Sequence, residues 1–359
     1  MRSIDKTTID ILKNWSQGKK PTELEQDELV ARELANFTHA HSFGITRDNC
    51  EKLIEARSQF FCSVYQETFD WCCSQGLQDE IKVFSLLWGL WLPLAVNLAE
   101  TRQKLGRTPI QGILGGQGTG KSTLAQVLQR LLDHLDYTTA NFSLDDLYKT
   151  YTERYKLQKN DPRLIWRGPP GTHDVYLGIQ VLEQCLQPEC NEPILIPRFD
   201  KSLYNGMGDR IKPEAIPKAD IVIFEGWFVG VRPIDNKIFD TPIPPIETVQ
   251  DIQFAKDNNE RLKAYLPLWD KLDRLLVLYP KDYRYSKQWR KEAEHKMIAS
   301  GKTGMRDDQI DDFVDYFWRA LHPKLFITPL IKNPDLVDLV IEIDSDRTYD
   351  RIYKPGTDI

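Results

Sequence analysis

The chain has 359 residues, of which 41% are hydrophobic and 28% are charged, as in an ordinary soluble globular protein longer than one usual core. Its net charge of −6 argues against nucleic acid or an anionic membrane as a partner, because both normally require a basic face. Its six cysteines form no C-x-x-C pair, which indicates reduced thiols and a cytoplasmic location rather than zinc or disulfide bonds.

Residues 1–105 are predicted to be helical throughout. Thr22 and Glu25 have the spacing of a capping box at a helix start. The most apolar run, 84–99, is shorter than the roughly 20 residues that cross a membrane, and Pro93 interrupts it. It is therefore predicted to be a buried or interface helix. The first ten residues contain acids and no apolar core, so we expect no signal or transit peptide. No motif with recognisable chemistry occurs in this region.

A complete phosphate-loop motif, G-x-x-x-x-G-K-[ST], follows the strand-like segment 109–114 and opens the helical pattern 121–134. Its backbone N–H groups can surround phosphate oxygens at a helix N-terminus. Lys121 can reach the β- and γ-phosphates, and the Ser122 hydroxyl can bind Mg²⁺. The alternative is a glycine-rich turn that merely precedes a helix, but such a turn has no need of every residue of the G-x-x-x-x-G-K-[ST] motif. The predicted nucleotide-binding residues are Gly115, Gly116, Gln117, Gly118, Thr119, Gly120, Lys121, Ser122 and Thr123.

From residue 108 onward strands and helices alternate, which is typical of a parallel sheet. The predicted fold is α/β, a P-loop NTPase-like, mostly parallel sheet flanked by helices, with an all-helical N-terminal extension. The domain boundary is placed at 105/106. Predicted strands are 109–114, 138–143, 193–197, 220–224, 274–279 and 337–343. Predicted helices are 121–134, 173–187, 257–272, 282–299 and 307–321, with a short one at 146–151.

Acidic residues follow two of these strands, at the sheet edge where α/β proteins bind ligands. Asp145 and Asp146 follow the second strand and can accept a proton from an attacking hydroxyl or hold Mg²⁺. The alternative is a helix cap formed by Ser143 or Asp145. Glu225 follows four apolar residues, which is the Walker B pattern of a Mg²⁺-binding acid.

Three loops, 166–174, 197–202 and 206–210, combine Arg or Lys with turn residues and suit a small anionic substrate. The alternative for each loop is solvated surface charge. The tract 284–296 is basic on one helical face and can form a lid that delivers Arg290 to the transferred phosphoryl group. It can equally be an exposed helix with pairs such as Arg290–Glu294.

Taken together, these segments resemble the D-glycerate 3-kinases of plants and cyanobacteria, relatives of phosphoribulokinase, uridine kinase and bacterial pantothenate kinase. The resemblance covers about 108 to 345. Its motifs are the phosphate loop, 143–148, 167–168 with 171–174, 197–198 with 201–202, 208–210, 224–227, Trp289-Arg290, and Gly304-Met305 with 312–314.

This resemblance implies a P-loop kinase domain at 106–359 that uses ATP and Mg²⁺ to phosphorylate the 3-hydroxyl of D-glycerate, with a place in photorespiration. It puts Asp145 at the position of the catalytic base, while the role of Asp146 stays open. The expected catalytic residues are Asp145, Lys121 and Arg290, and the expected metal ligands are Ser122 and Glu225. The expected substrate-binding residues are Arg167, His173, Asp174, Arg198, Lys201 and Arg210, with the carboxylate held by Arg198, Lys201 or Arg210, singly or together.

Two other functions fit the same motifs. A related kinase would act on uridine, pantothenate or a phosphoribulokinase-type acceptor. A non-catalytic protein would bind ATP on the same fold, although it would have no need of Asp145. The adenine pocket, the oligomeric state and the role of 1–105 are not predicted.

Overall fold

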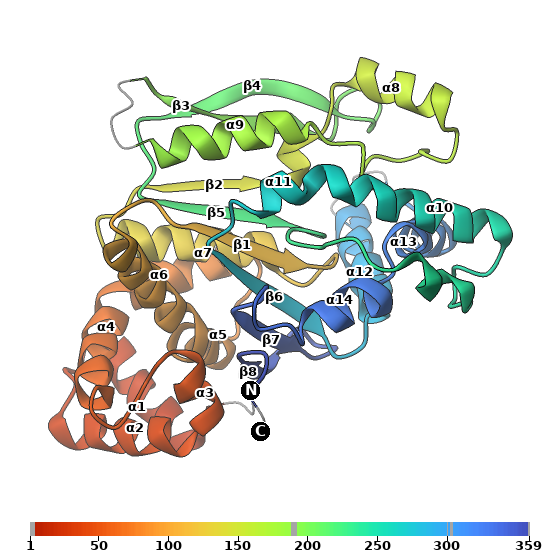
Figure 1. Ribbon diagram of the computed structural model, residues 1–359. Coiled ribbons are helices and arrows are strands. Elements are labelled where there is room, and N and C mark those ends of the chain that lie inside the picture. The colour runs from red at the N-terminus through yellow and green to blue at the C-terminus, as the bar shows by residue number, and fades with distance from the viewer. Residues whose placement is uncertain (1–3, 188–191, 300, 302–303, 358–359) are drawn as a thin grey trace.

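The computed structural model describes residues 4–187, 192–299, 301 and 304–357 (Figure 1). Its centre is a six-stranded sheet in the order β2-β5-β1-β6-β7-β8, in which the first five strands are parallel and β8 is antiparallel to β7. The predicted mostly parallel sheet is thus confirmed. Its strands are β1 (Ile110–Gly115), β2 (Thr139–Ser143), β5 (Ile221–Gly226), β6 (Arg274–Pro280), β7 (Leu339–Ile343) and β8 (Tyr349–Tyr353).

The central strands are apolar on both faces because helices cover both faces. In β5, Ile221 and Ile223 belong to the core beneath α7, whereas Val222 and Phe224 belong to the core beneath the helices of the opposite face. The first core is covered by α7 (Lys121–Asp133) and the N-terminal helices. The second is covered by α9 (Val175–Leu186), α10 (Val249–Arg261), α11 (Leu266–Trp269) and α14 (Pro323–Leu330).

The N-terminal region is helical, as predicted, and is continuous with the first core. The Thr22–Glu25 capping box is present. The stretch Glu80–Leu105 is long and apolar enough to cross a membrane by composition, but 72% of its apolar window is buried inside the protein. This stretch contains residues 84–99, which the sequence predicted to form a buried or interface helix. The helices are α1 (Lys6–Ser16), α2 (Glu23–Ala35), α3 (Phe37–Ser42), α4 (Cys50–Ser74), α5 (Glu80–Leu86), a π-helical turn η1 (Leu87–Trp91) and α6 (Leu92–Leu105).

A second, two-stranded antiparallel sheet consists of β3 (Ile194–Asp200) and β4 (Asp209–Ile216). Figure 1 shows this hairpin beside α9, near the β2 edge of the main sheet. The predicted strand 193–197 therefore exists but lies outside the main sheet. Neither β4 nor β8 was predicted, because β4 is largely exposed and charged and β8 is a short edge strand, so neither has a continuous apolar run.

Two helix predictions need correction, and one helix was missed. The helix expected at 146–151 is instead a 3₁₀ turn, η2 (Leu144–Leu147), and α8 (Tyr151–Asn160) begins at its own Thr150 cap. The helix expected at 257–272 begins earlier, where Thr248 caps α10, and continues through η4 (Leu262–Tyr265) into α11. The short α14 was not predicted. The remaining elements are α12 (Tyr285–Ala299), α13 (Asp307–Ala320) and η3 (Asn236–Asp240).

Of the cysteines, Cys50, Cys62, Cys72, Cys73 and Cys185 are free thiols, and Cys190 lies outside the described residues.

Candidate active site

The phosphate loop joins the fully buried strand β1 to the N-terminus of α7. Gly118 has a φ of 78°, and a Cβ added there would lie 2.6 Å from the Cβ of Trp289, so only glycine fits. Lys121 Nζ donates a hydrogen bond to the Gly116 carbonyl at 3.0 Å. Burial lowers the pKa of Lys121, and the carboxylates of Glu225 and Asp145 oppose that shift. These two carboxylates therefore act on the ammonium group of the loop.

Glu225 lies at the carboxyl end of β5, paired in register with Ile113 of β1 and Ser143 of β2. Its Oε1 accepts a hydrogen bond from Ser122 Oγ at 2.8 Å. In the described residues no three His, Cys, Asp or Glu side chains cluster as a metal site. One carboxylate and one hydroxyl next to a phosphate loop nevertheless fit Mg²⁺, which completes its octahedron with phosphate oxygens and water.

Asp145 follows β2 in the turn η2, beside Lys121. Its Oδ1 accepts a hydrogen bond from the Tyr148 hydroxyl at 2.8 Å, and its Oδ2 accepts one from Lys201 Nζ at 2.6 Å. Burial raises the pKa of Asp145, but the charge and hydrogen bond of Lys201 and the hydrogen bond of Tyr148 outweigh burial and leave that pKa lowered. The carboxylate is thus held in its ionised form, with each of its oxygens oriented by a hydrogen bond.

Asp146 has a different environment. Its oxygens accept hydrogen bonds from the backbone N–H groups of Ser143 at 2.9 Å and Phe199 at 3.3 Å, and it pairs with Arg198 at 3.2 Å. Arg198 also binds Glu214 at 2.7 Å. Both Asp146 and Arg198 therefore fasten the β3–β4 hairpin to the main sheet, and the guanidinium of Arg198 already has two carboxylate partners.

His173 and Tyr148 form a wall behind Asp145. Their rings stack with centroids 4.6 Å apart, and a short backbone bridge joins the two residues. The Tyr265 oxygen accepts the Gly171 N–H at 2.9 Å and lies 2.8 Å from His173 Nδ1. The Tyr265 hydroxyl and His173 Nδ1 thus form one hydrogen bond, while the buried Nε2 of His173 has no hydrogen-bond partner among the described residues. Burial lowers the pKa of His173 to about 3, so the ring is neutral.

The other predicted cations differ in their partners. Arg210 pairs with Asp174 at 3.0 Å and donates to the Tyr148 carbonyl. Arg167 donates to the carbonyl of Gly206 at 2.6 Å, in the turn of the hairpin. Asp174 is also the N-cap of α9. The predicted substrate-binding residues are thus brought around Asp145 and the hairpin turn, and Lys201 pairs with Asp145 itself.

Arg290 lies on α12, where it pairs with the buried Glu294 at 3.0 Å and covers the Phe313 ring at 5.5 Å. The same helix brings Trp289 against the phosphate loop. Sequence analysis did not find Arg347, whose Nε donates to the Gly118 carbonyl at 3.3 Å. Arg347 belongs to no motif; the pairing of β7 with β8 places its turn, and an ion pair with Glu292 of α12 at 2.7 Å holds its side chain.

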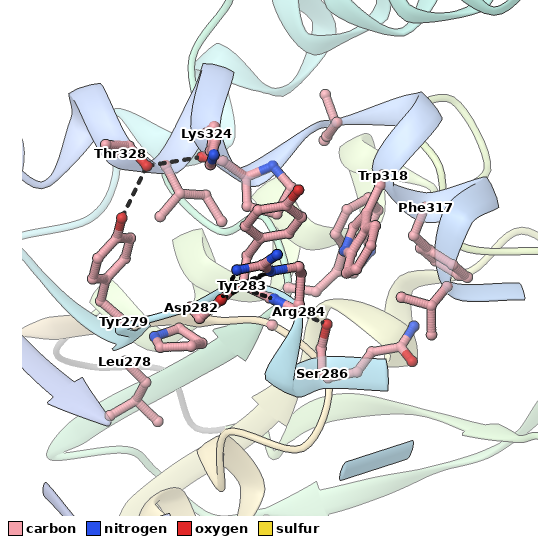
Figure 2. Close-up of a pocket in the computed structure, with 18 of the residues that line it drawn as sticks. Leu278, Tyr279, Asp282, Tyr283, Arg284, Ser286, Phe317, Trp318, Lys324 and Thr328 are labelled. Carbon is pink, nitrogen blue, oxygen red and sulfur yellow. Dashed lines mark hydrogen bonds and ion pairs between the residues drawn. The ribbon is translucent and has the colours of Figure 1, made fainter. Parts of the chain in front are cut away.

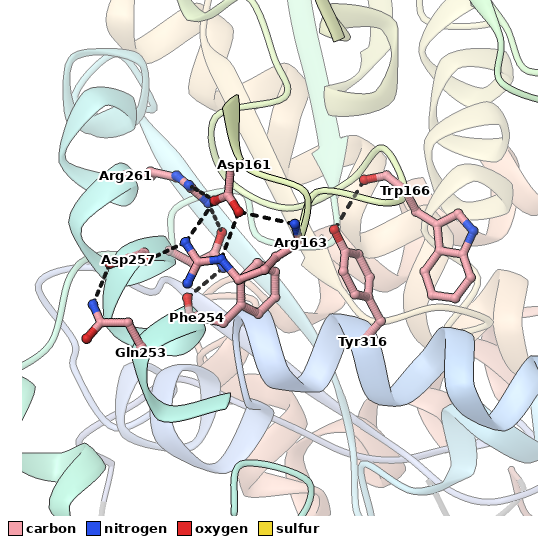
Figure 3. A network of polar contacts seen from close by, with 9 residues as sticks. Asp161, Arg163, Trp166, Gln253, Phe254, Asp257, Arg261 and Tyr316 are labelled. Atoms are coloured by element: carbon pink, nitrogen blue, oxygen red, sulfur yellow. Dashed lines mark hydrogen bonds and ion pairs between the residues drawn. The ribbon is translucent and has the colours of Figure 1, made fainter. Parts of the chain in front are cut away.

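A polar network holds the loop that leads to Trp166 and Arg167 (Figure 3). Arg163 bonds Asp161 at 2.7 Å and Asp257 of α10 at 2.6 Å, and Arg261 bonds Asp161 at 2.6 Å. The Arg163–Asp257 and Asp161–Arg261 bonds therefore fasten the beginning of this loop to α10. The position of Arg167 is therefore set by α10 as well as by its own loop.

A cavity of about 510 Å³ opens beside Gly116 and Gln117 on the α14 side of the phosphate loop (Figure 2). Its walls are mainly apolar, with Leu278 of β6 and Trp318 of α13 among them, and Tyr283 packs edge-on against Trp318 with centroids 4.7 Å apart. The cavity touches the loop residues that precede Lys121 and borders the start of α12.

No protein-family model matches the chain. A D-glycerate 3-kinase of Arabidopsis thaliana, described as chloroplastic, is 33% identical over 250 residues, which are 66% of this chain and 52% of that protein. The chain thus spans about half the length of this relative. The uncharacterized kinase mug58 of Schizosaccharomyces pombe is 36% identical over 220 residues, 59% of this chain and 79% of that protein. The solved structure of D-glycerate 3-kinase from Cryptococcus neoformans has a TM-score of 0.66 and 26% identity, covering 74% of this chain and 99% of that chain.

Proposed function

Because this chain belongs to the family of P-loop kinases that includes D-glycerate 3-kinase, we propose that it transfers the γ-phosphoryl group of ATP to the 3-hydroxyl of D-glycerate, giving 3-phosphoglycerate. The observation that carries this proposal is the position of Asp145. This residue lies beside Lys121 of the phosphate loop and within hydrogen-bond distance of Lys201. A base for a hydroxyl, a cation for phosphate and a cation for a carboxylate thus lie together.

The proposed reaction is a single displacement at phosphorus. The 3-hydroxyl oxygen forms a bond to Pγ while the bond from Pγ to the β,γ-bridging oxygen breaks, and ADP leaves. The hydroxyl proton passes to the Asp145 carboxylate and from there to solvent. Because the transition state is loose, Asp145 acts mainly by orienting the hydroxyl and accepting its proton late.

The cations neutralise the charge that builds up during transfer. Lys121 would bind the β- and γ-phosphates, and Arg290 lies on α12, whose Trp289 packs against Gly118 of the loop. Ser122 and Glu225 would hold Mg²⁺, which supplies further charge neutralisation on the phosphates. Tyr148 holds Asp145 through one oxygen, and His173, which burial keeps neutral, stacks on the Tyr148 ring.

A coupled assay tests the proposal by following ADP release with ATP and a panel of acceptors: D-glycerate, L-glycerate, uridine and pantothenate. We expect D-glycerate to have the highest kcat/KM and the product to be the 3-phosphate, as identified by its ³¹P NMR spectrum. Preferred turnover of uridine or pantothenate would overturn the acceptor, and ATP binding without turnover of any acceptor would overturn the kinase activity.

A further inference from the structure

The ammonium group of Lys201 pairs with the carboxylate of Asp145, the proposed base. Lys201 is the first residue after β3, in the hairpin turn, and its Nζ lies 2.6 Å from Asp145 Oδ2. The Lys201 side chain is 59% exposed and that of Asp145 is 31% exposed. A long, flexible ammonium side chain on an exposed turn can change partners without moving the sheet that carries Asp145.

The Lys201–Asp145 ion pair makes Asp145 a weaker proton acceptor. Asp145 has both of its oxygens bonded, one to Tyr148 and one to Lys201, and the groups that act on its charge are Lys201, Tyr148, His173 and Lys121. Among these groups, Lys201 contributes most to lowering the pKa of Asp145 against the effect of burial. A carboxylate with a lowered pKa is a weaker proton acceptor. The ion pair therefore holds the base in a less reactive state.

The neighbouring arginines are bound elsewhere. Arg198 pairs with Asp146 and Glu214, and Arg210 pairs with Asp174. Arg167 donates to backbone carbonyls of the hairpin turn. An anion that enters next to Asp145 thus meets Lys201 as the cation whose change of partner affects the base directly.

We propose that Lys201 selects the acceptor by exchanging its partner: a carboxylate on the acceptor draws the ammonium group from Asp145 and so releases the base, whereas neutral alcohols and water leave the ion pair intact. This inference rests on the proposed function and adds the reason for its substrate class. A three-carbon hydroxy acid is short enough for its hydroxyl to reach Asp145 while its carboxylate binds Lys201. Without an acceptor the Lys201–Asp145 ion pair stays intact, and this intact pair limits ATP hydrolysis.

The test compares Lys201→Met with wild type on D-glycerate and on glycerol, which has the same carbon chain without the carboxylate. In Lys201→Met, kcat/KM for D-glycerate should fall about 10- to 100-fold, the factor that a lost charge-assisted hydrogen bond carries. The value for glycerol should stay the same or rise, and ATP hydrolysis without acceptor should exceed that of the wild type. Lys201→Arg should restore part of the preference for D-glycerate, and Lys212→Gln, exposed on β4 of the same hairpin, should behave as wild type.

The pH profile gives an independent readout. The base works when it is ionised, so kcat/KM falls as the pH drops through the pKa of Asp145, and removal of Lys201 should move this acidic limb to higher pH. An equal loss on both acceptors, an unchanged preference for D-glycerate, or an unmoved acidic limb would each overturn the exchange. If the wild type does not phosphorylate D-glycerate, the proposed acceptor is wrong. The exchange is then tested by the same variants on the carboxylated and neutral acceptors that are turned over.

Discussion

The hydroxyl of Ser122 donates a hydrogen bond to the carboxylate of Glu225 across 2.8 Å, which joins the phosphate loop to the end of the neighbouring strand. We expect Glu225→Gln to raise the Mg²⁺ concentration needed for half-maximal activity by about ten-fold or more, because loss of an oriented charged ligand weakens metal affinity by about that factor. The measurement is a Mg²⁺ titration of the kinase rate at fixed ATP. Glu183→Gln, an exposed carboxylate of α9, is the matched control. An unchanged Mg²⁺ requirement would place the metal elsewhere.

The adjacent acids should separate catalysis from structure. Asp145→Asn should lower kcat by about 10²–10⁴ with little change in ATP affinity, since it removes the proton acceptor and leaves the phosphate loop intact. Asp146→Asn should instead lower the melting temperature, because Asp146 binds two backbone N–H groups and Arg198.

Calorimetric ATP titration beside the coupled assay distinguishes these outcomes, and Lys121→Ala should weaken both binding and turnover. An Asp145→Asn protein that keeps more than about a tenth of the wild-type kcat would exclude the base role.

The N-terminal helices should matter for stability alone. Glu33 is buried between Arg57 at 2.7 Å and His39 at 2.5 Å, and the other ring nitrogen of His39 lies 2.7 Å from the Gly89 carbonyl in the π-helical turn. Burial raises the pKa of Glu33, but Arg57 and His39 outweigh burial and lower it to about 2. Glu33→Gln leaves the buried guanidinium of Arg57 without its carboxylate and should lower the free energy of unfolding by about 3–5 kcal/mol.

Urea unfolding measures this loss, with the exposed Glu28→Gln of the same helix as control. Kinetic constants measured where the variant is folded should equal those of the wild type. A drop in kcat at full folding would show that residues 1–105 contribute to the chemistry.

Acid should destabilise the fold partly through His322. This fully buried histidine accepts the Lys324 N–H through Nδ1 and lies 3.1 Å from the Pro244 carbonyl through Nε2. Burial lowers the pKa of His322 to about 4. Because the unfolded chain binds this proton at higher pH than the folded chain, stability falls as the pH drops from about 6.5 toward about 4. Between pH 7 and 5 the loss should be about 2 kcal/mol.

Urea unfolding of His322→Asn at both pH values checks this linkage, since asparagine can still cap α14. The pH-dependent loss should be smaller by about 2 kcal/mol than in the wild type, whereas His41→Asn, at an exposed position, should change nothing. An equal pH dependence in His322→Asn would mean that other groups carry the linkage.

The amino-acid sequence by itself determined the phosphate loop, the acid after β5, the sheet class and the family, because each depends on residues that are contiguous or on a local period. The contact between Ser122 and Glu225 joins distant residues and was still predictable, since Ser122 belongs to the phosphate-loop motif and Glu225 ends a recognisable strand. The role of Asp145 versus Asp146 was open in the sequence, where the two acids are adjacent. Only the folded hairpin directs Lys201 to Asp145 and Arg198 to Asp146.

The tertiary structure alone decided the remaining partners. The sequence predicts Arg198, Lys201 and Arg210 all to be substrate-binding cations, yet all three are paired with carboxylates, which lie 52, 56 and 36 residues away along the chain. Arg347 reaches the phosphate loop from 229 residues away, through the pairing of an edge strand that has no apolar pattern of its own. Local propensity fixes where strands and loops lie, but the partner of a charge depends on which distant segment the packing brings within about 3 Å of it.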